Sequence, residues 1–108
     1  MRLDVWLTDD AVSDLNELYE YIARHDTPRK ADNVLVEIEK AFGSLSESPN
    51  RGAFPKELLE LGIREFREIF FKPYRIIYKV AEKKVYVFLI VDCRRDMQLL
   101  LQRRLLQA

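Results

Sequence analysis

Three apolar segments joined by very short connections constrain the fold of this 108-residue chain more than any other feature. The segments cover residues 64–71, 74–81 and 84–92, and only Lys72-Pro73 and Glu82-Lys83 separate them. Segments of this length that are rich in β-branched and aromatic residues are typical of strands, and strands joined by so few residues pair as antiparallel neighbours. The sequence therefore predicts a three-stranded antiparallel meander. Because Glu82-Lys83 contains neither Gly nor Asn, which tight hairpin turns prefer, we expect a loop of more than two residues there.

Two amphipathic helices are predicted before these strands. Apolar residues recur at helical spacing over residues 12–22 and again over residues 31–45. Thr8 and Thr27 stand where an N-cap is needed, and Pro28 follows at a first helical position. Residues 48–52, Ser-Pro-Asn-Arg-Gly, end the second helix. Because few residues join the two helices, we expect them to pack as an antiparallel hairpin.

The remaining elements complete one small domain. Residues 3–7 predict an opening strand, residues 56–61 predict one helical turn that Gly62 ends, and residues 96–106 predict a last amphipathic helix. The expected fold class is therefore α+β, with an N-terminal strand, an antiparallel helical hairpin, a three-stranded antiparallel meander and a C-terminal helix. We expect the helical hairpin to cover one face of the sheet, and all elements to form a single domain over residues 1–108.

The neutral net charge of the chain hides an unequal distribution. Residues 1–61 carry 7 Lys or Arg against 13 Asp or Glu, a net charge of −6, whereas residues 62–108 carry 11 against 5, a net charge of +6. The strand-rich half is therefore expected to meet an anionic partner.

The composition also excludes several classes of protein. A single Cys and a single His allow neither a disulfide framework nor a cysteine or histidine metal cluster, and no glycine-rich phosphate-binding motif is present. We therefore expect no cofactor and no metal. The longest apolar run, residues 85–91, is too short to cross a bilayer, so we expect no membrane association and a cytoplasmic location.

The arginines of the strand-rich half are the candidate functional residues: Arg67, Arg75, Arg94 and Arg95. Arginine stays charged and binds phosphate or carboxylate groups through paired hydrogen bonds, so a cluster of arginines across a sheet would suit an RNA backbone or an acidic protein segment. The alternative is that they pair inside the chain with the nearby carboxylates Glu65, Glu68, Asp92 and Asp96. For Arg67 and Arg75 both interpretations stay open.

Other ionisable side chains favour ordinary structural roles. Glu57 and Glu60 lie in a segment that is interpreted as a solvated helix face. His25 is expected to be exposed or to cap a helix end. Cys93 follows an apolar strand and is expected to be a buried, unreactive thiol.

The order and spacing of these elements resemble the RelE/ParE superfamily of toxins from bacterial type II toxin–antitoxin modules. The resemblance covers essentially the whole chain and rests on DLNELYEYIA, ADNVLVEIEKAFGSL, SPNRG, FREIFFKPYRIIYKV and VYVFLIVDCRRDMQLLLQRRL. Its most specific pieces are Tyr-Arg-Ile-Ile-Tyr at residues 74–78 and Arg-Arg-Asp at residues 94–96. The resemblance implies an α+β fold with a helical hairpin against an antiparallel sheet. It also implies a dedicated antitoxin that wraps and neutralises the toxin. In such a pair only the antitoxin contacts operator DNA.

The superfamily divides by target. RelE-like members cleave messenger RNA on the ribosome with basic residues, often helped by a Tyr or His near the C-terminus, whereas ParE-like members inhibit DNA gyrase and have no known hydrolytic site. By this resemblance Arg75 matches the strand arginine of the RelE-like enzymes, and Arg94 or Arg95 matches the later basic residue. Arg67 and Glu68 complete the candidate catalytic set for a nuclease, with Glu65 as an alternative base.

The C-terminus departs from the RelE-like pattern, because neither Tyr nor His follows Arg95. The long helical hairpin is also more similar to ParE. We therefore expect a non-enzymatic gyrase inhibitor, with a ribosome-dependent mRNA endoribonuclease as the alternative. A superfamily member that has lost toxicity and acts as a binding module is the third hypothesis. The residues expected to contact a partner are Arg67, Arg75, Tyr78, Arg94 and Arg95.

Overall fold

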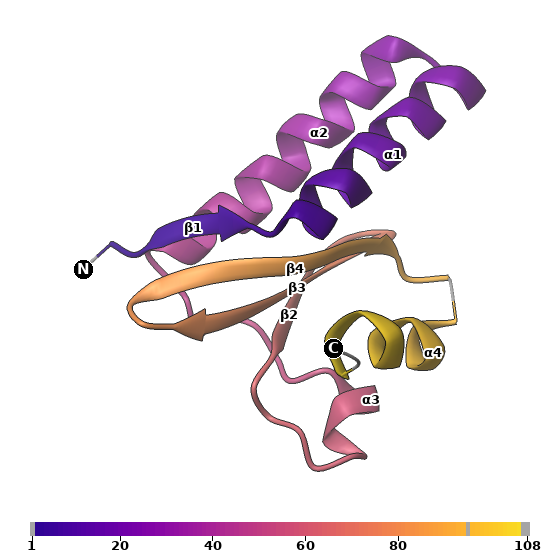
Figure 1. The fold of residues 1–108 in the computed structure, drawn as a ribbon. Coiled ribbons are helices and arrows are strands. Elements are labelled where there is room, and N and C mark those ends of the chain that lie inside the picture. The colour runs from indigo at the N-terminus through magenta and orange to yellow at the C-terminus, as the bar shows by residue number, and fades with distance from the viewer. Residues whose placement is uncertain (1, 95, 107–108) are drawn as a thin grey trace.

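The computed structural model describes residues 2–94 and 96–106, and its elements follow the order that the sequence predicts (Figure 1). The elements are β1 (Asp4–Leu7), α1 (Asp9–His25), α2 (Pro28–Gly43), the 3₁₀ turn η1 (Ser44–Ser46), α3 (Lys56–Leu59), β2 (Arg67–Phe71), β3 (Tyr74–Ala81), β4 (Lys84–Asp92), α4 (Met97–Leu101) and the π-helical turn η2 (Gln102–Leu106). The predicted α+β class is confirmed.

The four strands form one sheet in the order β1-β4-β3-β2. β2, β3 and β4 pair as the predicted antiparallel meander, whereas β1 pairs in parallel with β4, with Asp4 opposite Lys84. The register between β3 and β4 shifts at one point, where Tyr78 opposes Val87 and the preceding residue opposes Leu89. Phe88 is therefore an extra residue in β4, and such a bulge changes which residues of the strand face each side of the sheet.

Side-chain caps fix the start of both long helices where the sequence predicts them. The Thr8 hydroxyl accepts a hydrogen bond from the backbone N of Ala11 at 3.1 Å, and the Thr27 hydroxyl accepts one from the backbone N of Lys30 at 3.0 Å. Pro28 then occupies the first turn of α2, where its missing N–H would have no intrahelical partner. Both caps are confirmed.

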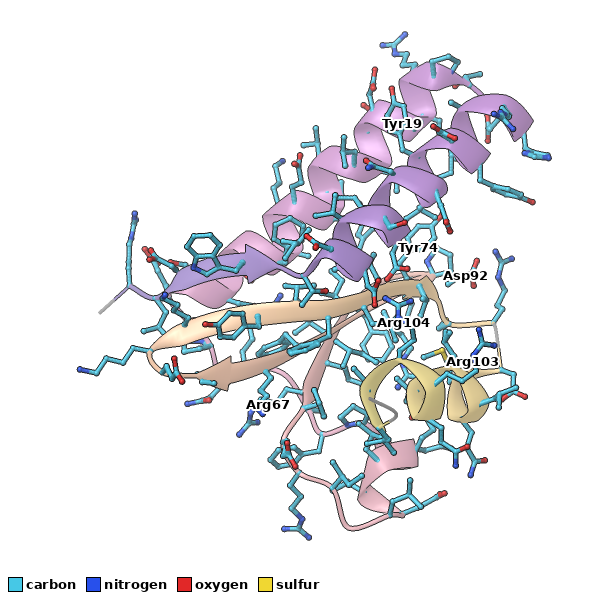
Figure 2. The ribbon with its side chains drawn as sticks, in the orientation of Figure 1. Tyr19, Arg67, Tyr74, Asp92, Arg103 and Arg104 are labelled. Atoms are coloured by element: carbon cyan, nitrogen blue, oxygen red, sulfur yellow. The ribbon has the colours of Figure 1, made fainter. Side chains whose placement is uncertain are left out.

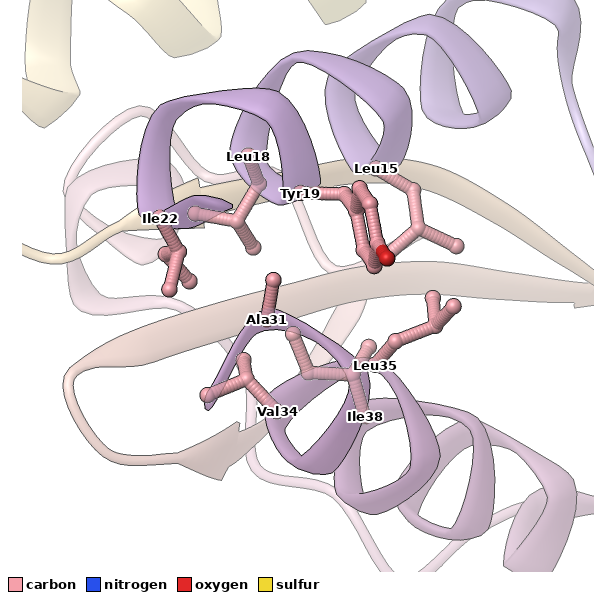
Figure 3. A pocket seen from close by; sticks show the side chains of 8 residues that line it. All are labelled: Leu15, Leu18, Tyr19, Ile22, Ala31, Val34, Leu35 and Ile38. Atoms are coloured by element: carbon pink, nitrogen blue, oxygen red, sulfur yellow. The ribbon is translucent and has the colours of Figure 1, made fainter. Parts of the chain in front are cut away.

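The hairpin of α1 and α2 covers one face of the sheet (Figure 1). Apolar side chains from the two helices meet along the seam between them, as Figure 3 shows. The seam is lined by Leu15, Leu18, Tyr19, Ile22, Ala31, Val34, Leu35 and Ile38. Below it, buried residues of the sheet complete the larger hydrophobic core: Ile69, Tyr74, Ile76, Tyr78, Val85, Val87 and Ile90.

A smaller core lies on the opposite face of the sheet, under α3 and the C-terminal segment. It consists of Leu58, Phe66, Ile77, Leu89, Val91, Met97, Leu100 and Leu101. Asp96 caps α4 by accepting a hydrogen bond from the backbone N of Leu99 at 3.3 Å. The sheet is thus covered on both sides, and the two cores share its middle strands. Within the described residues no helix is long and apolar enough to cross a membrane.

Two local predictions were wrong. The first strand of the meander begins at Arg67 and not at residue 64, because Phe66 leaves the sheet to pack in the smaller core. The β3–β4 connection is a turn of two residues, in which Glu82 (φ 53°) and Lys83 (φ 63°) both adopt the left-handed conformation of a type I′ turn. The register of the two long buried strands therefore overrides the local preference for Asn and Gly.

Candidate functional site

The sheet separates the predicted arginine cluster. In the register of β2 and β3, Arg67 opposes Tyr78, whereas Arg75 opposes Phe70. Directly opposed residues share a face of the sheet. Arg67 therefore lies on the face covered by the helical hairpin, and Arg75 lies on the other face. The expectation of one basic cluster that includes both arginines was wrong.

Arg75 is the centre of a buried ion triad with two glutamates. Only 6% of Arg75 is exposed. Its Nη1 and Nη2 donate to the two carboxylate oxygens of Glu57 at 2.9 and 3.0 Å, and its Nε donates to Oε1 of Glu68 at 2.9 Å. Nη2 also donates to the same oxygen of Glu68. Each of its three guanidinium nitrogens therefore hydrogen-bonds to a carboxylate of the chain.

The triad holds one cation between two carboxylates, and the pKa shifts of Arg75 and Glu57 favour their charged forms. The hydrogen bond from Arg75 lowers the pKa of Glu57 and outweighs its partial burial, which alone would raise this pKa. For Arg75, burial alone would lower the pKa, but the hydrogen bonds to Glu57 and Glu68 outweigh this effect and the pKa is raised. At neutral pH Arg75 is therefore a fixed cation and is not a source of protons.

A shallow cavity of about 260 Å³ opens beside the triad. Its lining includes Phe54, Lys56, Phe70 and Cys93 in addition to the three triad residues. Cys93 is exposed here, so the expectation of a buried thiol was wrong. The prediction erred because the chain leaves the sheet directly after Asp92, and the next side chain therefore has no layer to cover it.

Arg67 binds the loop between η1 and α3. Its Nη1 donates to the carbonyl oxygens of Gly52 at 2.8 Å and Asn50 at 3.4 Å, and its guanidinium lies 4.5 Å from the centre of the Phe54 ring. The side chain thus supplies hydrogen bonds to backbone carbonyls that have no strand beside them. Its partners are carbonyls, not the glutamates that the sequence suggested.

Tyr78 is fully buried and holds the same loop from inside. Its hydroxyl donates to the carbonyl oxygen of Pro49 at 2.7 Å and accepts from the backbone N of Gly52 at 3.0 Å. A Cβ at Gly52 would lie 2.6 Å from this hydroxyl oxygen, so the loop needs glycine at this position. The geometry leaves Tyr78 no surface for a partner, and its predicted role in binding has no support.

Among the predicted arginines that the structure describes, Arg94 is the one with an exposed side chain. Its Nε donates to Oδ1 of Asp92 at 2.9 Å, its Nη2 contacts the other carboxylate oxygen, and its side chain is 77% exposed. Asp92 thus forms the ion pair that the sequence favoured. Arg95, the fourth predicted arginine, lies outside the described residues.

Arg94 also lines a groove of about 540 Å³ between α1 and the ends of β3 and β4. The floor and walls of this groove are formed by Asp14, Glu17, Leu18, Tyr21, Ile22, Tyr74, Ile90, Val91 and Asp92. Burial, and then the charge of Asp92, raise the pKa of Tyr74, so this phenol stays neutral. The groove is apolar at its base and acidic along its rim.

Three residues at these sites were missed by sequence reasoning. Glu57 was interpreted as solvated, yet its side chain is only 18% exposed and holds Arg75. Asp14 and Arg104 form a bidentate ion pair across the β4 edge, with distances of 3.0 and 2.9 Å. No local pattern indicates these contacts, because each joins segments that are far apart in the sequence.

The remaining ionisable groups with a predicted role are His25 and Glu65. Nδ1 of His25 donates to the carbonyl oxygen of Tyr21 in its own helix at 3.0 Å, and the His25 ring stacks on the Tyr21 ring. It lies at the exposed end of α1, as expected. Glu65, the alternative base, is exposed and lies 3.4 Å from Lys79. Of the described candidate catalytic residues, Arg75 and Glu68 are therefore bound to each other, and Glu65 is exposed.

Comparison with known proteins agrees with this architecture. The family model for "ParE toxin of type II toxin-antitoxin system, parDE" matches residues 5–97. A solved structure of the chromosomal ParDE toxin–antitoxin system from P. aeruginosa is similar, with a TM-score of 0.71 and 19% identity over 84% of this chain and 96% of that chain. The toxin–antitoxin complex RelBE2 from Mycobacterium tuberculosis gives a TM-score of 0.56 and 23% identity over 85% of this chain and 92% of that chain. A search of curated proteins gave no match.

The two structural matches show the shared fold, and the family match covers most of the chain, from β1 to the first residue of α4. The strand arginine, the long helical hairpin and the order of elements lie inside the matched range. The chain belongs to the ParE toxin family of type II toxin–antitoxin systems.

Proposed function

We propose that this toxin acts by binding and inhibiting DNA gyrase, without cleaving RNA, and that a cognate antitoxin holds it inactive in the cytoplasm. The observation that carries the proposal is the state of Arg75. A nuclease of the RelE type would need this strand arginine to contact phosphate. In this chain its guanidinium is buried and bound to both Glu57 and Glu68.

Releasing Arg75 for catalysis would be costly. An RNA phosphate would have to approach two carboxylates, and the buried glutamates would be left without a counter-charge when the arginine moved away. Glu68 is also held in the triad, because its Oε1 accepts hydrogen bonds from two nitrogens of Arg75. Arg75 and Glu68, two of the candidate catalytic residues, are therefore better explained as members of a structural triad with Glu57, which supports inhibition by binding.

Arg94 is the predicted contact residue that the geometry still supports. It is exposed at the rim of the groove beside α1, and it belongs to the strand-rich, positively charged half of the chain. Arginine is enriched among the residues that contribute most to protein–protein binding, and a charge at the rim of an interface affects electrostatic complementarity and the association rate. Arg67 contributes indirectly, by holding the loop at residues 50–54.

The test is a supercoiling assay with purified toxin, gyrase, ATP and relaxed plasmid. We expect the toxin to inhibit supercoiling, and Arg94→Glu to raise the half-inhibitory concentration by about tenfold, because a rim charge has been reversed. Arg64→Glu, at another exposed arginine, is the matched control and should change it less than about twofold. Unchanged supercoiling together with cleavage of ribosome-bound message by the same preparation would refute the proposal.

A further inference from the structure

The outer edge of β4 is only partly covered by a strand. β1 pairs with β4 from Lys84 to Val87, and no strand within the described residues continues this pairing along Phe88 to Asp92. A sheet edge of this kind presents backbone N–H and C=O groups that are ready to pair with an additional strand. The question is therefore what satisfies these groups in the free chain.

Two side chains satisfy them in place of a strand. Oδ2 of Asp14 accepts a hydrogen bond from the backbone N of Ile90 at 3.1 Å, and Nη2 of Arg104 donates to the carbonyl oxygen of Phe88 at 3.2 Å. The C=O of one residue and the N–H of the residue two positions later are the groups that a neighbouring strand would use. Asp14 and Arg104 thus supply one acceptor and one donor, as a paired strand would.

The two side chains also bind each other across the edge. Arg104 comes from the C-terminal segment on one side of the sheet, and Asp14 comes from α1 on the other (Figure 2). The hydrogen bond with Asp14 raises the pKa of Arg104 and outweighs its partial burial, so the pair stays charged. The edge is therefore closed by an ion pair between elements that belong to different cores.

The charge beside this edge favours a basic segment. The groove along Ile90 is rimmed by Asp14, Glu17 and Asp92, and Asp10 lies 3.7 Å from the Arg104 guanidinium. Apart from Arg104 itself, the cation at this rim is Arg94. The apolar part of the groove lining includes Leu18, Ile22 and Ile90, together with the exposed ring of Tyr21. An extended segment with apolar residues and one arginine on the same face would match both properties.

We propose that residues 88–92 of β4 are a strand-addition site for an extended segment that carries an arginine, and that Arg104 occupies this site in the free chain. The incoming backbone replaces Asp14 at the N–H of Ile90 and Arg104 at the carbonyl of Phe88. The incoming arginine then takes the place of Arg104 beside Asp14. This inference rests on the proposed function in one respect: the natural source of the segment is the antitoxin.

The inference gives the two members of the ion pair opposite effects. Arg104 competes with the segment, so its removal should strengthen binding, because the site no longer has to be vacated first. Asp14 binds the arginine of the segment, so its removal should weaken binding. A purely structural ion pair would instead give two variants that change binding in the same direction.

The experiment uses two synthetic peptides in place of the antitoxin, so that it can fail independently of the proposed function. One has the sequence Val-Thr-Val-Thr-Arg-Thr-Val-Thr-Val, and the other has Gln at its centre. Titration followed by backbone amide NMR should shift the amide of Ile90. The arginine peptide should bind about tenfold more tightly than the glutamine peptide.

The variants then supply the decisive comparison with the arginine peptide. Arg104→Gln should lower the dissociation constant by about fivefold or more, and Asp14→Asn should raise it by a similar factor. Arg103→Gln, at the exposed neighbouring arginine, is the matched control and should leave it unchanged. Thermal melts check that each variant is folded, and Arg104→Lys gives an intermediate result if Arg104→Gln unfolds.

Three results would overturn the proposal. The first is weaker peptide binding in both Arg104→Gln and Asp14→Asn. The second is equal affinity for the arginine and glutamine peptides. The third is a peptide-induced shift confined to β2, the opposite edge of the sheet, with the Ile90 amide unmoved. If the antitoxin complex forms while the peptides fail, the proposed function stands and the strand-addition site is wrong.

Discussion

Replacing Arg75 with methionine should destabilise the protein strongly and in a pH-dependent way. The side chains of Arg75, Glu68 and Glu57 are 7%, 10% and 18% exposed, so water screens the triad only weakly. Removing one partner of such a buried pair costs about 3–5 kcal/mol, because the remaining charge is left without compensation. For a domain with a total stability of roughly 5–15 kcal/mol, this is a large fraction.

The pH dependence follows from the direction of the pKa shift. In the wild type the pKa of Glu57 is lowered in the folded state, so its contribution to stability is present above the unfolded pKa and is lost as the pH falls through the folded value. In Arg75→Met the hydrogen bond that lowers the pKa of Glu57 is absent. The carboxylates of Glu57 and Glu68 then face each other without a cation, and their repulsion raises the folded-state pKa of at least one of the two. Protonation of a carboxylate in acid restores stability to the variant. The loss of unfolding free energy caused by Arg75→Met should therefore be largest at pH 7 and smaller near pH 4.5.

Urea denaturation of the wild type and of Arg75→Met at the two pH values measures this loss of unfolding free energy. The fluorescence of Trp6, the single tryptophan, and circular dichroism give independent probes of unfolding. Arg75→Met combined with Glu68→Met is the control, and it should recover about half of the loss because the apposed charge is also gone. A deficit below about 1 kcal/mol at pH 7, or one that does not shrink in acid, would refute the role of the triad.

Substitutions at three further places test local features of the fold by the midpoint of urea unfolding. Gly52→Ala should destabilise by about 3 kcal/mol, since its Cβ would lie 2.6 Å from the Tyr78 hydroxyl; an unchanged midpoint would show that the loop can move aside. Replacing Glu82 and Lys83 with Asn and Gly should stabilise by about 1–2 kcal/mol, because both positions have positive φ, and a lower midpoint would contradict this. Thr27→Ala should cost about 1 kcal/mol through loss of the α2 cap, whereas Thr27→Ser should cost much less.

The sequence predicts well those features that depend on local chemistry. The caps at Thr8 and Thr27 and the limits of β3 and β4 follow from hydroxyl acceptors, apolar periodicity and short connections. The α+β class follows from the order of these elements. The parallel placement of β1 beside β4 was not predicted, because strand order depends on packing between segments that are distant in the chain.

The candidate site was less predictable for the same reason. The question whether Arg75 is free or paired depends on Glu57, which lies in a short helical turn 18 residues earlier. The alternation of side chains along β3 places Arg75 and Tyr78 on different faces of the sheet, but the burial of each depends on the positions of α3 and of the loop at residues 49–54. Sequence patterns identify which groups can form ion pairs, and only the packing decides which pairs form.

The parallel pairing of the first strand with the last also affects how the chain folds during its synthesis. Asp4 pairs with Lys84, so the first strand has no neighbour in the sheet until about 80 further residues have been made. The helical hairpin is synthesised early, but the sheet that covers its apolar face is completed only with β4. Contacts between residues so far apart close slowly, because loop closure precedes any gain from pairing. The sheet therefore cannot be complete before β4 has been synthesised, and a partner that recognises the finished sheet can bind only after that point.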